Sequence, residues 1–135
     1  MSMLGKNWRV RVSNTQNQAI TCIVKAIYWK FDSSGALVFS AEQTPLTSVS
    51  VAATAGSAVG ANIDNSTDKY LGMDLTVYMT ASLATNGTGS VSVYLERSTD
   101  AATTWPSQDL GRWVGGYLIP AANGTAEMRA NITVR

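Results

Sequence analysis

The sequence predicts an all-β protein, an antiparallel β-sandwich of roughly eight or nine short strands. Along residues 71–79 the apolar side chains occupy every second position, which is typical of a strand with one buried face. A second alternating run follows at 91–96, after a loop rich in Asn, Thr and Gly. Turn residues separate the other apolar runs, and no segment has a convincing helical repeat. Such spacing indicates a sandwich or barrel, including the eight-stranded jelly roll, and leaves the strand order open.

The two alternating runs within residues 70–98 are expected to be antiparallel neighbours at the centre of a sheet. The other strands are expected at 8–13, 19–31, 36–40, 48–53, 58–63, 112–119 and 126–135. The run 19–31 has apolar residues at both parities, which indicates a strand that is buried on both faces or one that changes face at a bulge. Residues 32–35 (DSSG) form a turn signal, and Pro45 is expected to interrupt the chain between strands.

Length and composition indicate one domain. At 135 residues the chain is long enough to bury its own core, so we expect a single domain at 8–135 that follows a flexible arm at 1–7. Only 14% of residues are charged, and an uncharged polar surface favours contact with other proteins. The net charge of +1 without a basic run gives no indication of nucleic-acid binding. No apolar run is long enough for a membrane helix, and residues 1–7 do not resemble a signal peptide, so a cytoplasmic site of synthesis is expected.

Few residues suit catalysis or metal binding. The chain has no histidine, the commonest general base and metal ligand. Cys22 is the only cysteine and is expected to be a buried thiol without a disulfide partner. Asp74 and Glu96, placed on neighbouring strands, are the one carboxylate pair that would suit a glycosidase. The favoured interpretation is instead that they are exposed carboxylates beside Arg97 or Arg129. We therefore expect no enzyme, no cofactor and no metal ion.

The segment 98–105 (STDAATTW) resembles the Asp-box of sialidases and related propellers, S-x-D-x-G-x-T-W. Ser98, Asp100, Thr104 and Trp105 match the pattern, and Ala102 stands in place of the glycine. In such a box the Asp and Ser side chains hydrogen-bond turn amides and the Trp packs beneath the turn. One copy cannot build a propeller, so the prediction is a structural turn.

Aromatic side chains allow two interpretations. Four tryptophans at positions 8, 29, 105 and 113, with five tyrosines, could stack on sugars, as in a carbohydrate-binding module. They are scattered along the chain, which favours roles in the core or in a subunit interface instead. Trp8, Arg9 and Arg11, on the first expected strand, are a candidate interface.

Residues 62–135 resemble small virion structural proteins of tailed bacteriophages. The likeness is carried by the stretches NIDNSTDKYLGMDLTVYMT, GTGSVSVYLERSTDAATTWP and GRWVGGYLIP. It implies a jelly-roll decoration (cement) protein on the capsid exterior, which binds the major capsid protein and itself as a homodimer or homotrimer, with no nucleic-acid or membrane partner. A tail or baseplate subunit and a carbohydrate-binding module are the alternatives.

Overall fold

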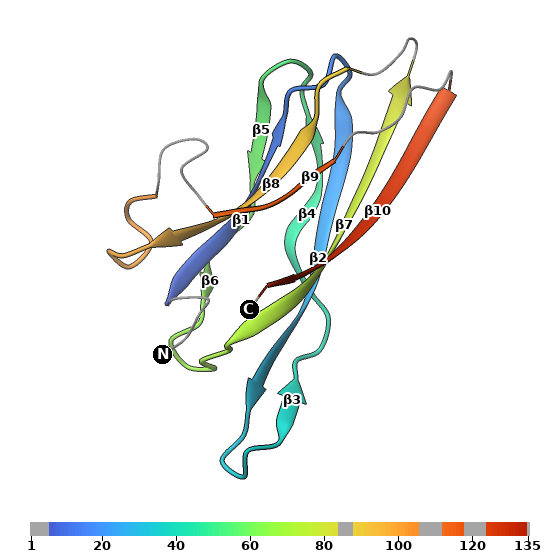
Figure 1. Cartoon of the computed structure of the whole chain (residues 1–135). Helices are drawn as coiled ribbons and strands as arrows, with labels where there is room; N and C mark the ends of the chain where they lie inside the picture. The colour runs from blue at the N-terminus through green and yellow to red at the C-terminus, as the bar shows by residue number, and fades with distance from the viewer. Residues whose placement is uncertain (1–5, 84–87, 106–111, 118–123, 135) are drawn as a thin grey trace.

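In the computed structural model the chain forms two antiparallel β-sheets that pack against each other (Figure 1). The structure describes residues 6–83, 88–105, 112–117 and 124–134, and this part of the chain contains no helix. One sheet consists of β1 (Asn7–Asn14), β5 (Gly56–Val59), β6 (Ile63–Asp64), β8 (Val91–Ser98) and β9 (Arg112–Tyr117). The other consists of β2 (Ile20–Phe31), β3 (Leu37–Phe39), β4 (Gln43–Val51), β7 (Gly72–Leu83) and β10 (Gly124–Val134). The predicted antiparallel β-sandwich is confirmed.

The strand order differs from the expectation for residues 70–98. The first sheet has the order β5-β1-β8-β9, with β6 also paired to β1, and the second has the order β10-β7-β2, with β3 and β4 both paired to β2. The strands β7 and β8 therefore lie in different sheets, and the prediction that they are neighbours was wrong. Alternation specifies which face of a strand is buried but not which strand lies beside it. Each of the two does have a neighbour on either side in its own sheet.

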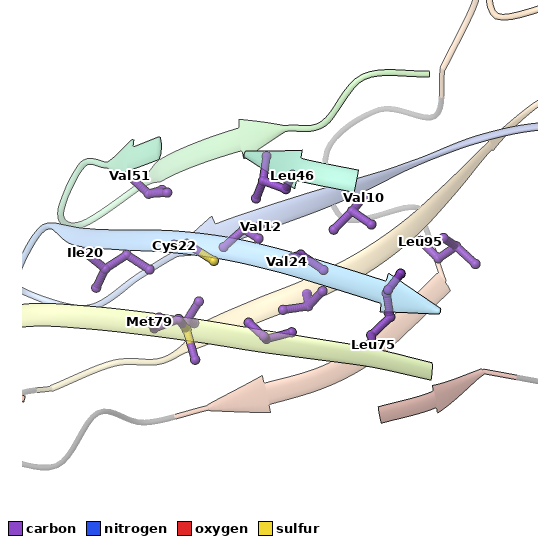
Figure 2. Packing of buried hydrophobic residues seen from close by; sticks show 14 of the residues in the cluster. Val10, Val12, Ile20, Cys22, Val24, Leu46, Val51, Leu75, Met79 and Leu95 are labelled. Carbon is purple, nitrogen blue, oxygen red and sulfur yellow. The ribbon is translucent and has the colours of Figure 1, made fainter. Parts of the chain in front are cut away.

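The core fills the space between the inner faces of the two sheets (Figure 2). The alternating residues of β7 supply Met73, Leu75, Val77 and Met79, all of them buried. The residues of β1, β2, β4 and β8 that face them are Trp8, Val10, Val12, Ile20, Cys22, Val24, Ala26, Tyr28, Leu46, Val51, Val91, Val93 and Leu95. Burial raises the pKa of the Cys22 thiol to about 12, so this side chain stays protonated and packs as a small apolar group.

Strand β2 buries one face rather than two. Every second side chain from Ile20 to Tyr28 is buried, whereas Ile27 on the other face is exposed and Ile23 is partly exposed. The second set of apolar residues therefore lies on the outer face of the sheet. Irregular register between β2 and β4, around Val24, marks a bulge there.

Pro45 and the N-terminal arm both differ from the expectation. Pro45 lies inside β4, buried, at the register shift between the pairs Val24–Leu46 and Ala26–Gln43. Proline has no backbone N–H to donate to the neighbouring strand. It is tolerated at a bulge because the ladder of hydrogen bonds is interrupted there. Asn7 belongs to β1 and the Lys6 carbonyl accepts a hydrogen bond of 2.7 Å from the Asn65 amide. The flexible arm expected at 1–7 therefore does not include residues 6 and 7, and residues 1–5 lie outside the described ranges.

Asn14 links the turn after β1 to the end of β4. Its side chain is buried, and its Nδ2 donates to the carbonyl oxygens of Gln18, Val51 and Ala52. Its Oδ1 accepts a hydrogen bond of 3.0 Å from the Gln16 amide. Buried carbonyl groups need such partners because water cannot reach them.

Across the described residues, no helix has the length and apolar character that a membrane span requires.

Candidate functional site

The outer face of the first sheet carries a buried ion triad made by Glu96 of β8 and Arg9 and Arg11 of β1. The Nε of Arg9 lies 2.6 Å from Glu96 Oε2, and the Nε of Arg11 binds Glu96 Oε1. The Glu96 side chain is 0% exposed, and the two arginine side chains are only 17% and 11% exposed. Arg11 Nη1 also donates to Ser57 Oγ of β5, at 3.4 Å. These three charged side chains on the outer face of the sheet are therefore largely shielded from water.

The Asp-box-like turn is folded by hydrogen bonds among its own residues. Ser98 Oγ donates to Asp100 Oδ1 at 2.7 Å and accepts a bond from the Ala102 amide at 3.0 Å. The Thr104 amide donates to Asp100 Oδ1 at 2.8 Å. Hydrogen bonds from Thr104, and next from Ser98, lower the pKa of Asp100 to about 2. Ala101 and Ala102 have φ of 56° and 68°, a left-handed backbone that favours glycine.

This turn places Trp105 over the ion triad. The Arg9 guanidinium lies 4.2 Å from the centroid of the Trp105 ring, within the range of a cation–π contact. The indole thus covers one arginine of the triad and shields it from water. The interface predicted at Trp8, Arg9 and Arg11 stays a prediction for the two arginines. Trp8 is 1% exposed and lies in the core, so it offers no surface to a partner.

The carboxylate pair considered for a glycosidase is separated. Asp74 lies on β7 of the second sheet, where its Oδ1 accepts a hydrogen bond of 2.8 Å from Thr133. Glu96 lies on β8 of the first sheet and pairs with two arginines. The prediction of a shared polar face was wrong, because it assumed that β7 and β8 are neighbours. The expectation that Glu96 is exposed was also wrong. Over the ranges that the structure covers, no group of three or more His, Cys, Asp or Glu side chains could hold a metal ion.

An exposed apolar surface lies on the hairpin formed by β2 and β3. It consists of Ile27, Trp29, Phe31, Leu37 and Phe39, and we call it the hairpin surface. Trp29 is opposite Phe39 and Phe31 is opposite Leu37 in the register, so these residues share one face. Four of the five are 39% to 58% exposed, and Trp29 is partly buried with its ring 6.5 Å from that of Phe31. The hairpin extends beyond the rest of the sandwich (Figure 1).

The hairpin surface continues into a groove on the outer face of the second sheet. Asp74 and Thr133 line this groove together with Trp29, Phe31, Leu37 and Phe39. The first residue of β7, Gly72, pairs with Trp29 of β2. Beyond Trp29, β2 pairs with β3 alone among the described strands. Sequence reasoning missed this surface, although the apolar residues at both parities of 19–31 were its signal.

A small cavity of about 200 Å³ lies at the end of the sandwich, between the two sheets. Trp8 of β1 and Tyr28 of β2 line it from the core, and their rings meet edge to face with centroids 5.5 Å apart. The remaining lining comes from Ser40 and Gln43 near β4, from Ile63 and Asp64 of β6, and from Asn65, Asp68 and Tyr70. The side chain of Asn65 holds this last segment closed through bonds to both backbone groups of Tyr70. No sequence motif indicated this cavity, because its residues come from four separate segments.

The candidate sugar-stacking tryptophans do not gather at one place. Trp8 lies in the core, Trp105 covers Arg9, and Trp29 belongs to the hairpin surface. The side chain of Trp113 lies outside the described part of the structure.

No protein-family model matches the chain, and comparisons with curated proteins and with solved structures find no match either.

Proposed function

We propose that this protein is a non-enzymatic structural protein that decorates an assembled phage capsid and binds its outer surface through the hairpin surface. The observation that carries the proposal is the cluster of exposed apolar side chains on a projecting hairpin. Contiguous exposed apolar patches mark interaction sites, because single-domain proteins otherwise bury such groups. Aromatic residues are also enriched where protein interfaces are driest.

The chemistry of the hairpin surface suits a protein partner with an apolar groove. The carboxylate at the hairpin tip, Asp32, accepts hydrogen bonds from the Ser34 and Ala36 amides. The carboxylate that lines the adjoining groove, Asp74, accepts a bond from Thr133. Association therefore requires little desolvation of unpaired charge, and the low charged content of 14% points the same way. The likeness of residues 62–135 to phage virion proteins supplies the specific partner, the major capsid protein.

The expected mechanism is associative. A rigid sandwich that binds only the assembled lattice shifts the equilibrium toward that lattice by mass action. A capsid coated with the protein should then resist heat or pressure better than a bare one. Self-association as a dimer or trimer would multiply the attachment points.

The test measures co-sedimentation of the purified chain with capsids of the phage or prophage that encodes it. Phe31→Ser combined with Phe39→Ser should weaken binding at least about 100-fold, since apolar anchors at an interface centre each contribute about 2 kcal/mol or more. Val59→Ser is the control, because Val59 is also an exposed apolar residue (44%) and lies on β5 of the other sheet. It should leave binding unchanged.

Electron cryomicroscopy of the particle then gives the location. Density for the sandwich on the head exterior, with the hairpin toward the capsid lattice, would support the proposal. Density in the tail or baseplate would contradict a capsid role and support the alternative of a tail or baseplate subunit. Absence from the particle would contradict both. Equal binding by the double variant and by the unaltered chain would contradict the role of the hairpin surface.

A further inference from the structure

Strand β10 forms a long, open edge of the second sheet (Figure 1). All 11 of its residues pair with β7 in one continuous register, without a bulge. Among the described strands, β7 is its only ladder partner, and β9 of the other sheet lies near β10 without pairing to it. Within the described structure, the backbone N–H and C=O groups on the other side of β10 therefore belong to no β-ladder.

The strands at the other sheet edges are short or interrupted. In the described part of the chain, β3, β5 and β6 have three, four and two residues. Strand β4 contains Pro45 and two register shifts, and β9 contains the adjacent Gly115 and Gly116 beside a register shift. Short strands, prolines and bulges are devices that keep a sheet edge from pairing with another chain. Strand β10 has none of them, so it is the edge best suited to accept a further strand.

We propose that β10 pairs with β10 of a second copy of this chain, antiparallel and about a two-fold axis at Met128. The second sheets of the two copies then form one continuous sheet across the dimer. In such an interface the same surface meets itself, so the strand must be complementary to its own reversed sequence. The proposal does not depend on capsid binding, because β10 and the hairpin surface share no residue.

The two charged residues of β10 select the register of this pairing. Met128 is opposite the buried Met79 of β7, so the alternate positions, Glu127 and Arg129, are on the outer face of the sheet. An axis at Met128 places Glu127 of each copy opposite Arg129 of the other. Moving the axis to Glu127 or to Arg129 places like charges opposite each other instead. Opposite charges directly across an antiparallel pair are stabilising and like charges are destabilising, so the register centred on Met128 is favoured.

The inner-face positions of β10 are compatible with the same register. Positions 126, 128, 130 and 132 are opposite residues of β7 that are all buried, and none of these four positions of β10 carries a charge. The register centred on Met128 places Ala126 opposite Ala130 and joins positions 124–132 of the two copies. The new ladder therefore gives the open backbone groups of both strands a partner without burying an unpaired charge.

The test is sedimentation velocity of the purified chain between about 1 and 100 μM, where the unaltered chain should form a dimer. Arg129→Glu places two glutamates opposite each other, and Glu127→Arg places two arginines opposite each other. Each change should weaken dimerisation at least about tenfold, because it acts at two symmetric positions. Lys25→Glu is the matched control: it reverses a charge at a side chain that is 46% exposed on β2 of the same sheet, and it should dimerise as the unaltered chain does.

The two charge-reversed variants also test the register directly. Mixed in equal amounts, Arg129→Glu and Glu127→Arg should form a heterodimer, because each glutamate of one chain then stands opposite an arginine of the other. The double variant, with both changes in one chain, restores the opposite charges and should dimerise again. These two results separate a lost interface from a lost fold, since an unfolded variant could not be rescued by a complementary charge.

A monomer at every concentration, a trimer, or a dimer that neither reversal weakens would overturn the proposal. Failure of either the mixture or the double variant to dimerise would overturn it as well. No capsid is present in this experiment, and Phe31→Ser combined with Phe39→Ser should dimerise as the unaltered chain does. The capsid proposal and the β10 dimer therefore fail independently.

Discussion

Glu96→Gln is expected to cost this protein much of its stability, because it leaves two nearly buried guanidinium groups without a counter-charge. Glu96 is 0% exposed and binds Arg9 and Arg11 through separate oxygens. Glutamine has almost the same shape, so packing is kept while the charge is lost. Breaking a buried ion pair by removing one partner typically costs about 3–5 kcal/mol, because the remaining charge stays desolvated.

The expected shift in melting temperature follows from the size of the chain. With about 2.1 cal/mol/K of unfolding entropy per residue, 135 residues give about 0.28 kcal/mol/K. A loss of about 3–5 kcal/mol then lowers the midpoint by about 10–18 °C. Urea unfolding followed by circular dichroism, together with a thermal scan, measures both quantities.

Two further variants test the reasoning for Glu96. Glu42→Gln breaks an exposed ion pair, in which the side chain of Lys25 is 46% exposed and that of Glu42 is 56% exposed. This change should cost less than about 1 kcal/mol of stability. Replacing all three triad residues together, with Arg9→Met, Arg11→Leu and Glu96→Leu, should return stability to near that of the unaltered chain, because no charge remains unpaired. A Glu96→Gln variant within about 1 kcal/mol of the unaltered chain would refute the claim that burial decides the strength of this pair.

Three other changes have defined outcomes. Ala102→Gly should raise the free energy of unfolding by about 1 kcal/mol, since Ala102 has a φ of 68°, which favours glycine. The control Ala58→Gly, inside strand β5, should instead lower the free energy of unfolding by about 0.5–1 kcal/mol. Urea titrations that give changes of the same sign for both variants would contradict this. Asp100 should stabilise the fold above about pH 4, because its pKa drops from 3.8 to about 2 on folding, and this contribution should disappear as the pH falls toward 2. The difference in stability between the unaltered chain and Asp100→Asn should therefore shrink over this pH range. A constant difference would contradict the role of Asp100. Asn14→Ala leaves three carbonyl groups without their donor and should cost about 2–4 kcal/mol; a loss below about 0.5 kcal/mol in the urea midpoint analysis would contradict the role of Asn14.

The alternation of side chains predicted which residues form the core. Met73, Leu75 and Val77 lie at every second position of one segment, and all three are buried. Val10 and Val12, which alternate with Arg9 and Arg11 in the strand expected at 8–13, are buried as well. Such patterns are informative because successive side chains of a strand point to opposite faces, so the buried face can be read from the residues alone.

The local chemistry of the turn at 98–105 was also within reach of the sequence. Ser98, Asp100 and Thr104 bond groups only a few residues away, so their spacing in the chain already brings them together. What Trp105 covers was not predictable, because Arg9 lies at the other end of the chain and reaches Trp105 only through the pairing of β1 with β8.

The fold class, the buried faces of the regularly alternating strands and the Asp-box-like turn were predictable from the residues, since all three depend on positions close together in the chain. The neighbours of each strand, and with them every candidate site, became apparent only in the folded protein. Strand pairing separates Asp74 from Glu96, buries Glu96 between two arginines, leaves the apolar face of the β2–β3 hairpin exposed, and brings Trp8 and Tyr28 together beside a cavity. The physical reason is that a strand's pattern specifies which side chains leave water, whereas the groups they meet there come from distant segments through the pairing of whole strands.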